Sequence, residues 1–120
     1  MIIPLKVKKL IESKTIALGT IGQKGPNVTP VSCCKVIDNN IIITDNFLGV
    51  TRSNILKNKK IAVVVWDDSI PNKEYGYKLF GIARHYNKGK WLDFVKKLKE
   101  NKGLSSKGAV VFSPNKIIEI

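Results

Sequence analysis

Short apolar runs, rich in β-branched residues and separated by a few turn residues, constrain this chain more than any other feature. Strand-like runs at 15–21 and 28–37 flank the segment GQKGPN, whose two Gly and one Pro favour a tight reversal. The sequence DNN at 38–40 then separates the second run from IIIT at 41–44. Connections this short join antiparallel strands, so they exclude a doubly wound parallel sheet here.

The rest of the chain continues the same pattern. β-Branched and alternating runs predict a central strand and three later ones, at residues 60–68, 75–86, 109–112 and 117–120, with the turn SPNK between the last two. Helical periodicity predicts three short helices, at residues 5–14, 51–57 and 89–102. We therefore predict one domain over residues 1–120, mainly β with short helices, as a six- to seven-stranded antiparallel barrel of Greek-key type.

The predicted second strand, 28–37, contains two unusual features. Pro30 cannot donate a ladder hydrogen bond, so its strand is expected at a sheet edge, or bulged or interrupted there. Cys33 and Cys34 are adjacent, and neighbouring residues of a strand point to opposite faces, which disfavours a disulfide between them. We expect two reduced thiols.

Charge and hydropathy limit the partners and the location. The chain carries 21 Lys and Arg against 9 Asp and Glu, a formal net charge of +12, which brings nucleic acid into consideration. The Lys residues are dispersed, however, and only two Arg residues are present, so nucleic acid is not the favoured partner. No apolar run approaches the roughly 20 residues of a membrane span, and no signal peptide is evident. We expect a cytoplasmic protein without membrane association.

Most motifs of catalytic chemistry are missing from the sequence. It has no phosphate-binding Gly-x-x-x-x-Gly-Lys loop, no Gly-x-Gly-x-x-Gly, no His-Glu-x-x-His and no Cys-x-x-Cys. The one His, His85, falls in an alternating strand and is expected at the surface or in the barrel wall. We therefore predict neither a catalytic residue nor a metal site and leave enzymatic activity open; a bound cofactor would supply any chemistry.

The segment GVTRSN, residues 49–54, is the strongest candidate for a binding site. It places hydroxyl, guanidinium and amide groups at the expected start of a helix, where free backbone N–H groups attract anions. The fork of Arg52 matches a phosphate group well. The alternative is that Thr51 merely caps the helix and Arg52 is solvated.

Four segments together resemble a known family. The segments ALGTIGQKGPNVTPVS, IIITDNFLGVTRSNILKNKKIAVVV, GYKLFGIARHY and KGAVVFSPNKIIEI are similar to the FMN-binding split-barrel family related to pyridoxamine 5′-phosphate oxidase, especially its small single-domain members. The resemblance implies a split β-barrel that holds FMN without a covalent bond at a homodimer interface. It also implies that the phosphate lies near the loop and helix after the third strand.

The resemblance also implies which residues contact FMN. The expected phosphate contacts are Thr51, Arg52 and Asn54. Val31, Ser32 and Cys33 are expected along the isoalloxazine ring, and Thr44, Asp45 and Asn46 beneath it. The chain departs from some relatives by having Val50 where they carry a basic residue. Arg52 or another basic residue must then reach the phosphate.

Several functions are compatible with these expectations. The first is an FMN-dependent redox protein, acting as a flavin reductase, a small oxidoreductase or an electron carrier, with NAD(P)H or a redox protein as its partner. The second is a Lys-rich nucleic-acid-binding barrel with stacking aromatics such as Tyr77 and Phe80. The third is a split barrel that binds a deazaflavin or haem instead, with His85 as the one histidine available to haem iron.

Overall fold

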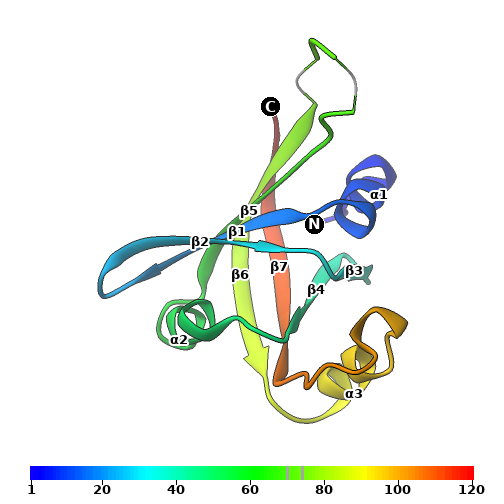
Figure 1. Cartoon of the computed structure of the whole chain (residues 1–120). Coiled ribbons are helices and arrows are strands. Elements are labelled where there is room, and N and C mark those ends of the chain that lie inside the picture. Colours follow the sequence, from blue (N-terminus) through cyan, green and yellow to red (C-terminus); the bar gives the residue numbers. More distant parts are fainter. Residues whose placement is uncertain (70, 74) are drawn as a thin grey trace.

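The computed structural model describes residues 1–69, 71–73 and 75–120. Its helices are α1 (Leu5–Ser13), α2 (Gly49–Lys57), α3 (Lys90–Lys96) and the short 3-10 turn η1 (Lys99–Asn101). Its strands are β1 (Ile16–Gly22), β2 (Gly25–Val31), β3 (Cys34–Ile37), β4 (Asn40–Asp45), β5 (Lys60–Trp66), β6 (Gly76–Tyr86) and β7 (Gly108–Glu119), arranged as in Figure 1. No helix in these ranges is long and apolar enough to cross a membrane.

The strands form one antiparallel sheet in the order β2-β1-β5-β6-β7-β4-β3. Its two edge strands, β2 and β3, are consecutive in the chain and are joined only by Ser32 and Cys33. The sheet therefore curls until its two edges meet at this two-residue link. The link lies outside the ladders of both strands, so the barrel closes without continuous pairing. This is the antiparallel split barrel that the sequence predicts.

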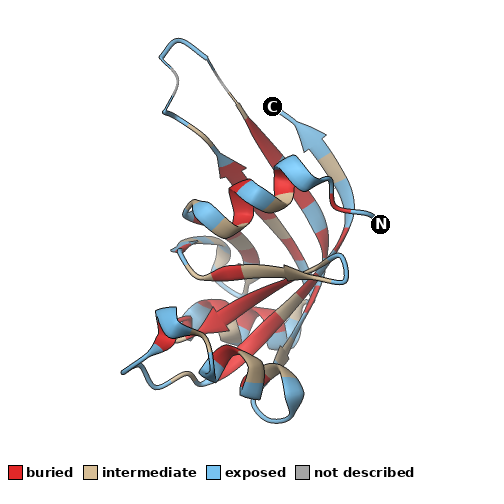
Figure 2. Ribbon diagram, turned by 90° about the vertical axis from the view of Figure 1, so that its right-hand side faces the viewer, coloured by how far each residue is buried: buried red, intermediate tan, exposed pale blue. Residues whose placement is uncertain are grey.

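The core fills the inside of the curled sheet and extends to its outer side under α3 (Figure 2). Ile41 and Ile43 of β4 belong to the inner cluster, whereas Ile42 packs outward with Leu92 and Val95 of α3. This placement explains the unbroken apolar run of β4, because both of its faces are covered. It also fixes the end of β4, where the candidate site begins.

The predicted second strand is in fact two strands at opposite edges of the sheet. β2 ends at Val31 and pairs with β1, while β3 begins at Cys34 and pairs with β4. A period-two pattern indicates an extended backbone but not its partner, so it does not reveal this change of neighbour. Pro30 does lie in an edge strand, as its missing N–H group predicts.

The C-terminal prediction of two strands around an SPNK turn is wrong. Residues 108–119 form one continuous strand along β6. The register shifts where Phe80 faces Lys116 but Gly81 faces Pro114, which leaves Asn115 as the extra residue of a bulge. A bulge accepts a Pro without ending the strand. The turn-forming residues of SPNK therefore indicate a bulge here and not a turn between two strands.

The helix boundaries also differ from the prediction. α2 begins at Gly49, so Thr51 is buried inside the helix and does not cap it. α3 ends at Lys96, before the predicted end near residue 102, and the short turn η1 follows. The side-chain amide of Asn101 donates a hydrogen bond to the Val95 carbonyl at 2.7 Å. This bond satisfies a carbonyl at the helix end and stabilises the early stop.

Gly81 provides a test of the β6–β7 contact. A Cβ built there would collide with the Ser113 carbonyl oxygen and lie 2.7 Å from Pro114 Cα, both backbone atoms. We therefore expect Gly81→Ala to lower the free energy of unfolding by about 2 kcal/mol or more in urea unfolding. The control is Gly19→Ala, whose Cβ would lie 3.5 Å from its nearest neighbour. Equal stability of the two variants would contradict the close approach.

Candidate functional site

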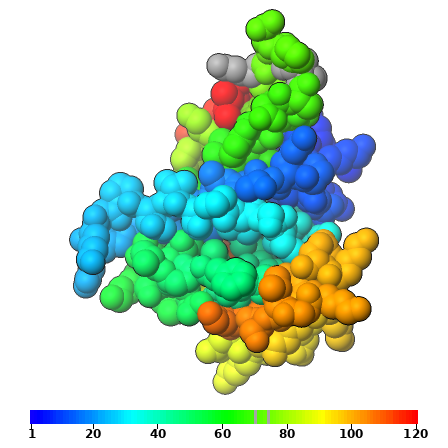
Figure 3. Space-filling view, viewed as in Figure 1, coloured from blue at the N-terminus to red at the C-terminus, as the bar shows by residue number. Residues whose placement is uncertain are grey.

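Two hollows border β2: one lies against the segment between β4 and α2, and the other lies against α2 itself. Figure 3 shows β2 above the segment that leads from β4 into α2. The split hollow, beside the Ser32–Cys33 link, has a volume of about 160 Å³. Its lining consists of Thr29, Pro30, Val31, Ser32, Cys33, Thr44, Asn46, Phe47 and Leu48. The hairpin hollow, beside the β1–β2 turn, has a volume of about 350 Å³. Its lining consists of Gly22, Gln23, Lys24, Gly25, Pro26, Asn27, Val50, Ser53, Asn54 and Lys57.

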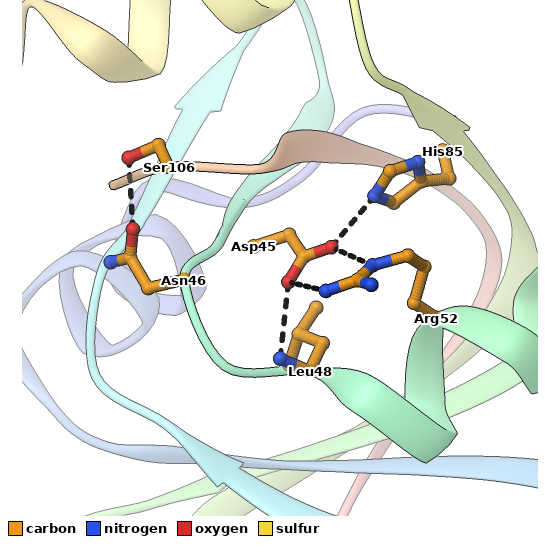
Figure 4. A network of polar contacts seen from close by, with 6 residues as sticks. All are labelled: Asp45, Asn46, Leu48, Arg52, His85 and Ser106. Atoms are coloured by element: carbon orange, nitrogen blue, oxygen red, sulfur yellow. Dashed lines mark hydrogen bonds and ion pairs between the residues drawn. The ribbon is translucent and has the colours of Figure 1, made fainter. Parts of the chain in front are cut away.

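The split hollow brings together most of the residues assigned to the ring by resemblance. Those in its lining are Val31, Ser32, Cys33, Thr44 and Asn46. They come from segments on either side of the β3–β4 hairpin, and the Thr44 N–H donates to the Cys33 carbonyl at 3.4 Å. Asp45 is the exception. It alternates with Thr44 and Asn46 along the chain, and its side chain points away from the hollow toward His85 and Arg52 (Figure 4).

The carboxylate of Asp45 has no exposed surface and accepts four hydrogen bonds. The Arg52 guanidinium donates through Nε at 2.5 Å and through one terminal nitrogen at 3.2 Å. The Leu48 N–H donates at 3.0 Å, and Nε2 of His85 lies 2.8 Å from the second carboxylate oxygen. One side chain thus joins the end of β4, the start of α2 and the end of β6.

These contacts determine the charge state of Asp45. Burial alone would raise the pKa of its carboxyl group, but the hydrogen bonds from His85, Arg52 and the Leu48 N–H outweigh that effect and hold the pKa well below its usual range. The same contact raises the pKa of Arg52. Asp45 is therefore ionised at neutral pH, and Arg52 acts as its counter-ion. The sequence-based hypotheses for Arg52 were a contact with phosphate or a solvated side chain. Neither of them predicts this ion pair with Asp45.

The other two predicted phosphate contacts face the β1–β2 hairpin. Thr51 is buried, and its hydroxyl accepts a hydrogen bond from the Asn27 side chain at 3.0 Å. Asn54 lines the hairpin hollow and donates to the Thr20 hydroxyl at 3.0 Å. A Cβ at Gly22 would collide with the Asn54 amide, so a glycine is needed for this packing. Both residues thus anchor the hairpin to α2.

Sequence reasoning missed a polar network behind the split hollow. The buried side chain of Asn101 donates to the Thr44 hydroxyl at 3.0 Å and accepts from the Asn46 amide at 3.1 Å. The Ser106 hydroxyl donates to Asn46 at 2.8 Å (Figure 4). These partners lie more than fifty residues apart in the chain, so no local motif could have revealed them. They fix the orientation of two side chains that line the hollow.

Both cysteines are free thiols, as predicted. Cys34 is buried in the core, and burial raises the pKa of its thiol far above the usual value, which keeps it protonated. Cys33 is half-buried in the split hollow, where the Thr44 hydroxyl lies 3.7 Å from its sulfur. Only Cys33 is therefore placed to contact a ligand in the hollow.

In the part of the chain that the structure describes, no group of three or more His, Cys, Asp and Glu side chains could hold a metal ion. His85 lies in the barrel wall, as expected, with 5% of its side chain exposed and its Nε2 engaged by Asp45. A side chain at position 108 would collide with the His85 ring, so Gly108 makes room for it. The histidine is thus a structural partner of Asp45.

The Asp45 network predicts a pH-dependent stability. We expect Asp45→Asn to lower the free energy of unfolding at pH 7 by about 2 to 3 kcal/mol, since Arg52 and His85 lose an ionised partner. Folding lowers the pKa of the carboxyl group, so its contribution is present above the unfolded pKa of about 4 and is lost as the pH falls toward the lower folded pKa. Urea unfolding of the wild type and the variant should show that their difference in free energy of unfolding becomes smaller below about pH 4. A difference that stays constant down to pH 3 would contradict this account.

Comparison with known proteins places the chain in a family. The family model described as pyridoxamine 5′-phosphate oxidase matches residues 3–120. An uncharacterised protein of Methanocaldococcus jannaschii is 32% identical over 118 residues, which cover 93% of this chain and 74% of that protein. The crystal structure of HupZ from Group A Streptococcus is 26% identical, with a TM-score of 0.87 over 99% of this chain and 94% of HupZ.

Two more distant structures share the fold. An FMN-binding protein from Syntrophomonas wolfei is 19% identical, with a TM-score of 0.77 over 96% of this chain and 84% of that one. HutZ, the haem storage protein from Vibrio cholerae, is 14% identical, with a TM-score of 0.73 over 98% and 94% of the two chains. The match over almost the whole chain shows that this protein belongs to the pyridoxamine 5′-phosphate oxidase family.

Proposed function

We propose that this protein is a cytoplasmic, single-domain flavoprotein that binds FMN non-covalently between two copies of the chain and uses it in redox reactions. The observation that carries this proposal is the split hollow, where Ser32, Cys33, Thr44 and Asn46 converge at a break in the sheet. Family membership and the fold shared with an FMN-binding protein support it. Because one fold can serve several functions, the proposal depends on the site.

The residues of the split hollow fit a flat ring with polar edges. At the link between β2 and β3, Ser32 and Cys33 lie outside both ladders. The Cys33 carbonyl accepts from the Thr44 N–H, and the other backbone groups of the link would face ring nitrogens and oxygens. Thr44 and Asn46 are held in place by Asn101, and a preoriented polar group costs less entropy when a ligand binds. Val31 and Pro30 provide apolar contact on the same wall.

A second copy of the chain would complete the site. The split hollow, at about 160 Å³, is smaller than the roughly 300 Å³ at which ligand pockets begin. The outer face of β2, β1, β5 and β6 also exposes apolar side chains, and it has a shallow hollow of about 410 Å³. The large exposed ones include Ile21, Val28, Phe80 and Ile82. A patch of this kind is typical of an interface between chains.

The hairpin hollow is the proposed phosphate end of the site. It lies next to the split hollow along β2, since Asn27 and Thr29 are two residues, or about 7 Å, apart. Lys24 and Lys57 line it together with Ser53 and Asn54. Arg52 already neutralises Asp45, so we assign the phosphate charge to these two lysines, with Asn54 as the neutral donor. Thr51 and Arg52 then hold α2 in position.

Bound FMN would accept and release electrons or hydride at its ring, and the chain would supply the surroundings. Ser32, Thr44 and Asn46 would bind and orient the ring edge. The lysines of the hairpin hollow and the net charge of +12 favour an anionic ligand. NAD(P)H or a redox protein would be the electron donor.

The geometry does not favour haem bound through His85. The imidazole is nearly fully buried and bonded to Asp45, so binding to iron would break the network that joins three elements. A deazaflavin shares the flat ring and a phosphate group with FMN, and a spectrum distinguishes the two. Visible absorbance after incubation with FMN and removal of the excess is the first test. A retained two-band flavin spectrum is expected, and a colourless protein would refute the proposal.

The phosphate assignment predicts a difference between FMN and riboflavin. Lys57→Ala combined with Lys24→Ala should weaken FMN binding by about tenfold to a hundredfold, because charge-assisted bonds to the phosphate are lost. Riboflavin, which has no phosphate, should bind the variant as it binds the wild type. Fluorescence titration with both ligands measures this.

Arg52→Ala is the matched comparison for the lysine variant. Its expected effect is a loss of stability of about 1 to 3 kcal/mol, since Asp45 keeps only part of its partners. Any loss of ligand affinity should then be equal for FMN and riboflavin. A selective loss of FMN affinity in this variant, with no loss in the lysine variant, would show that Arg52 binds the phosphate and the two lysines do not.

The second copy can be tested at the outer face of the sheet. Phe80→Glu places a charge at the centre of the exposed apolar patch and should convert a dimer into monomers that bind FMN at least about tenfold more weakly. Light scattering after size-exclusion chromatography, followed by FMN titration, measures both effects. Leu5→Glu, on exposed α1, is the control. A Phe80→Glu protein that remains a dimer would rule out this face as the dimer interface.

A further inference from the structure

One segment of the molecule carries seven exposed lysines; we call it the basic lobe and define it as residues 88–107, comprising α3, η1 and their flanks. Its exposed lysines are Lys88, Lys90, Lys96, Lys97, Lys99, Lys102 and Lys107. The lobe has two acidic residues, Asp93 and Glu100. Glu100 is neutralised by Lys35 of β3 at 2.6 Å. Seven of the nineteen lysines of the chain therefore make the exposed surface of the lobe cationic.

The basic lobe is bonded directly to the wall of the split hollow. Ser106 and Asn101 both belong to the lobe and form hydrogen bonds with the Asn46 side chain at 2.8 and 3.1 Å. Asn101 also donates to the Thr44 hydroxyl. A protein that docks on the lobe beside Asn101 and Ser106 would therefore lie next to the wall of the hollow that holds the ring. That proximity suits the transfer of electrons between two proteins.

Exposed apolar side chains accompany the lysines on this surface. Phe47, in the lining of the split hollow, has 82% of its surface exposed, and Leu104 of the lobe has 44%. In Figure 3 the orange segment of the lobe lies beside the green segment that follows β4. Apolar centres with charged surroundings are usual for interfaces between proteins, and charge complementarity speeds transient encounters.

We propose that the basic lobe docks a small acidic electron-transfer protein that reduces the flavin. The inference rests on the proposed function and names its partner class. With a one-electron carrier, two encounters oxidise two carrier molecules and reduce one flavin, which takes up one proton from water. Nucleic acid fits this surface less well, because the lobe contains no Arg and its Trp91 is half-buried against Phe94, which leaves little for base stacking.

The test uses a reduced acidic [2Fe–2S] ferredoxin as the probe and the FMN-loaded protein as the acceptor. Stopped-flow absorbance should show flavin reduction whose rate falls by at least about tenfold from low to high salt. The variant Lys99→Glu, Lys102→Glu, Lys107→Glu should lose at least about tenfold at low salt. The control, Lys9→Glu, Lys59→Glu, Lys73→Glu, makes the same change in net charge on exposed lysines elsewhere and should lose much less.

Two further measurements separate docking from flavin binding. Dithionite should reduce the flavin of all three proteins equally, which shows that the site itself is intact. Calorimetric titration of ferredoxin into the flavin-free protein tests docking even if FMN does not bind. Equal rates for the lobe variant and its control, no binding at low salt, or displacement of ferredoxin by a single-stranded oligonucleotide at equal concentration would each overturn the inference.

Discussion

Asp45 keeps an ionised carboxylate out of contact with water, and the arrangement of the site depends on how that charge is satisfied. Its partners come from α2 and from β6, so the carboxylate is bonded only when β4, β6 and α2 take one relative position. A buried ion pair adds little net stability after desolvation. Its consequence here is geometric, because it fixes the start of α2 against the ends of β4 and β6, and residues of β4 and α2 line the two hollows.

The local pattern of apolar and turn residues was enough to predict most strands of the barrel. The features that it did not predict depend on contacts between residues far apart in the chain. β-Branched runs and turn residues gave the antiparallel hairpins, and Pro30 gave an edge strand. The change of partner at Ser32 and Cys33 stayed hidden, because alternation is the same whichever strand is adjacent. At Pro114 and Asn115, turn-forming residues mark a bulge that lies opposite Gly81, on the neighbouring strand.

The same distinction applies to the candidate site. Five of the residues assigned by resemblance line one hollow, since they flank a single hairpin and its link. The role of Arg52 could not be read from its neighbours in the chain, because they do not reveal that Asp45 is buried beside it or that His85, forty residues further on, shares the carboxylate. The single histidine is thereby committed to the wall. HutZ, a haem storage protein, has the same fold. In this chain the bond to Asp45 occupies Nε2 of the histidine.

The position of β7 has a consequence for how the chain is made. This last strand lies between β6 and β4, so β4, with its run Ile41–Ile43, lacks a partner along one edge until residues 108–119 are available. Pairing over so long a separation is slow, and an apolar strand with a free edge is prone to association. Closure of the barrel, and with it the pairing of His85 with Asp45, must therefore wait until residues 108–119 have emerged from the ribosome. Until then the strands β2-β1-β5-β6 and the β3–β4 hairpin are two parts of the sheet that no strand joins.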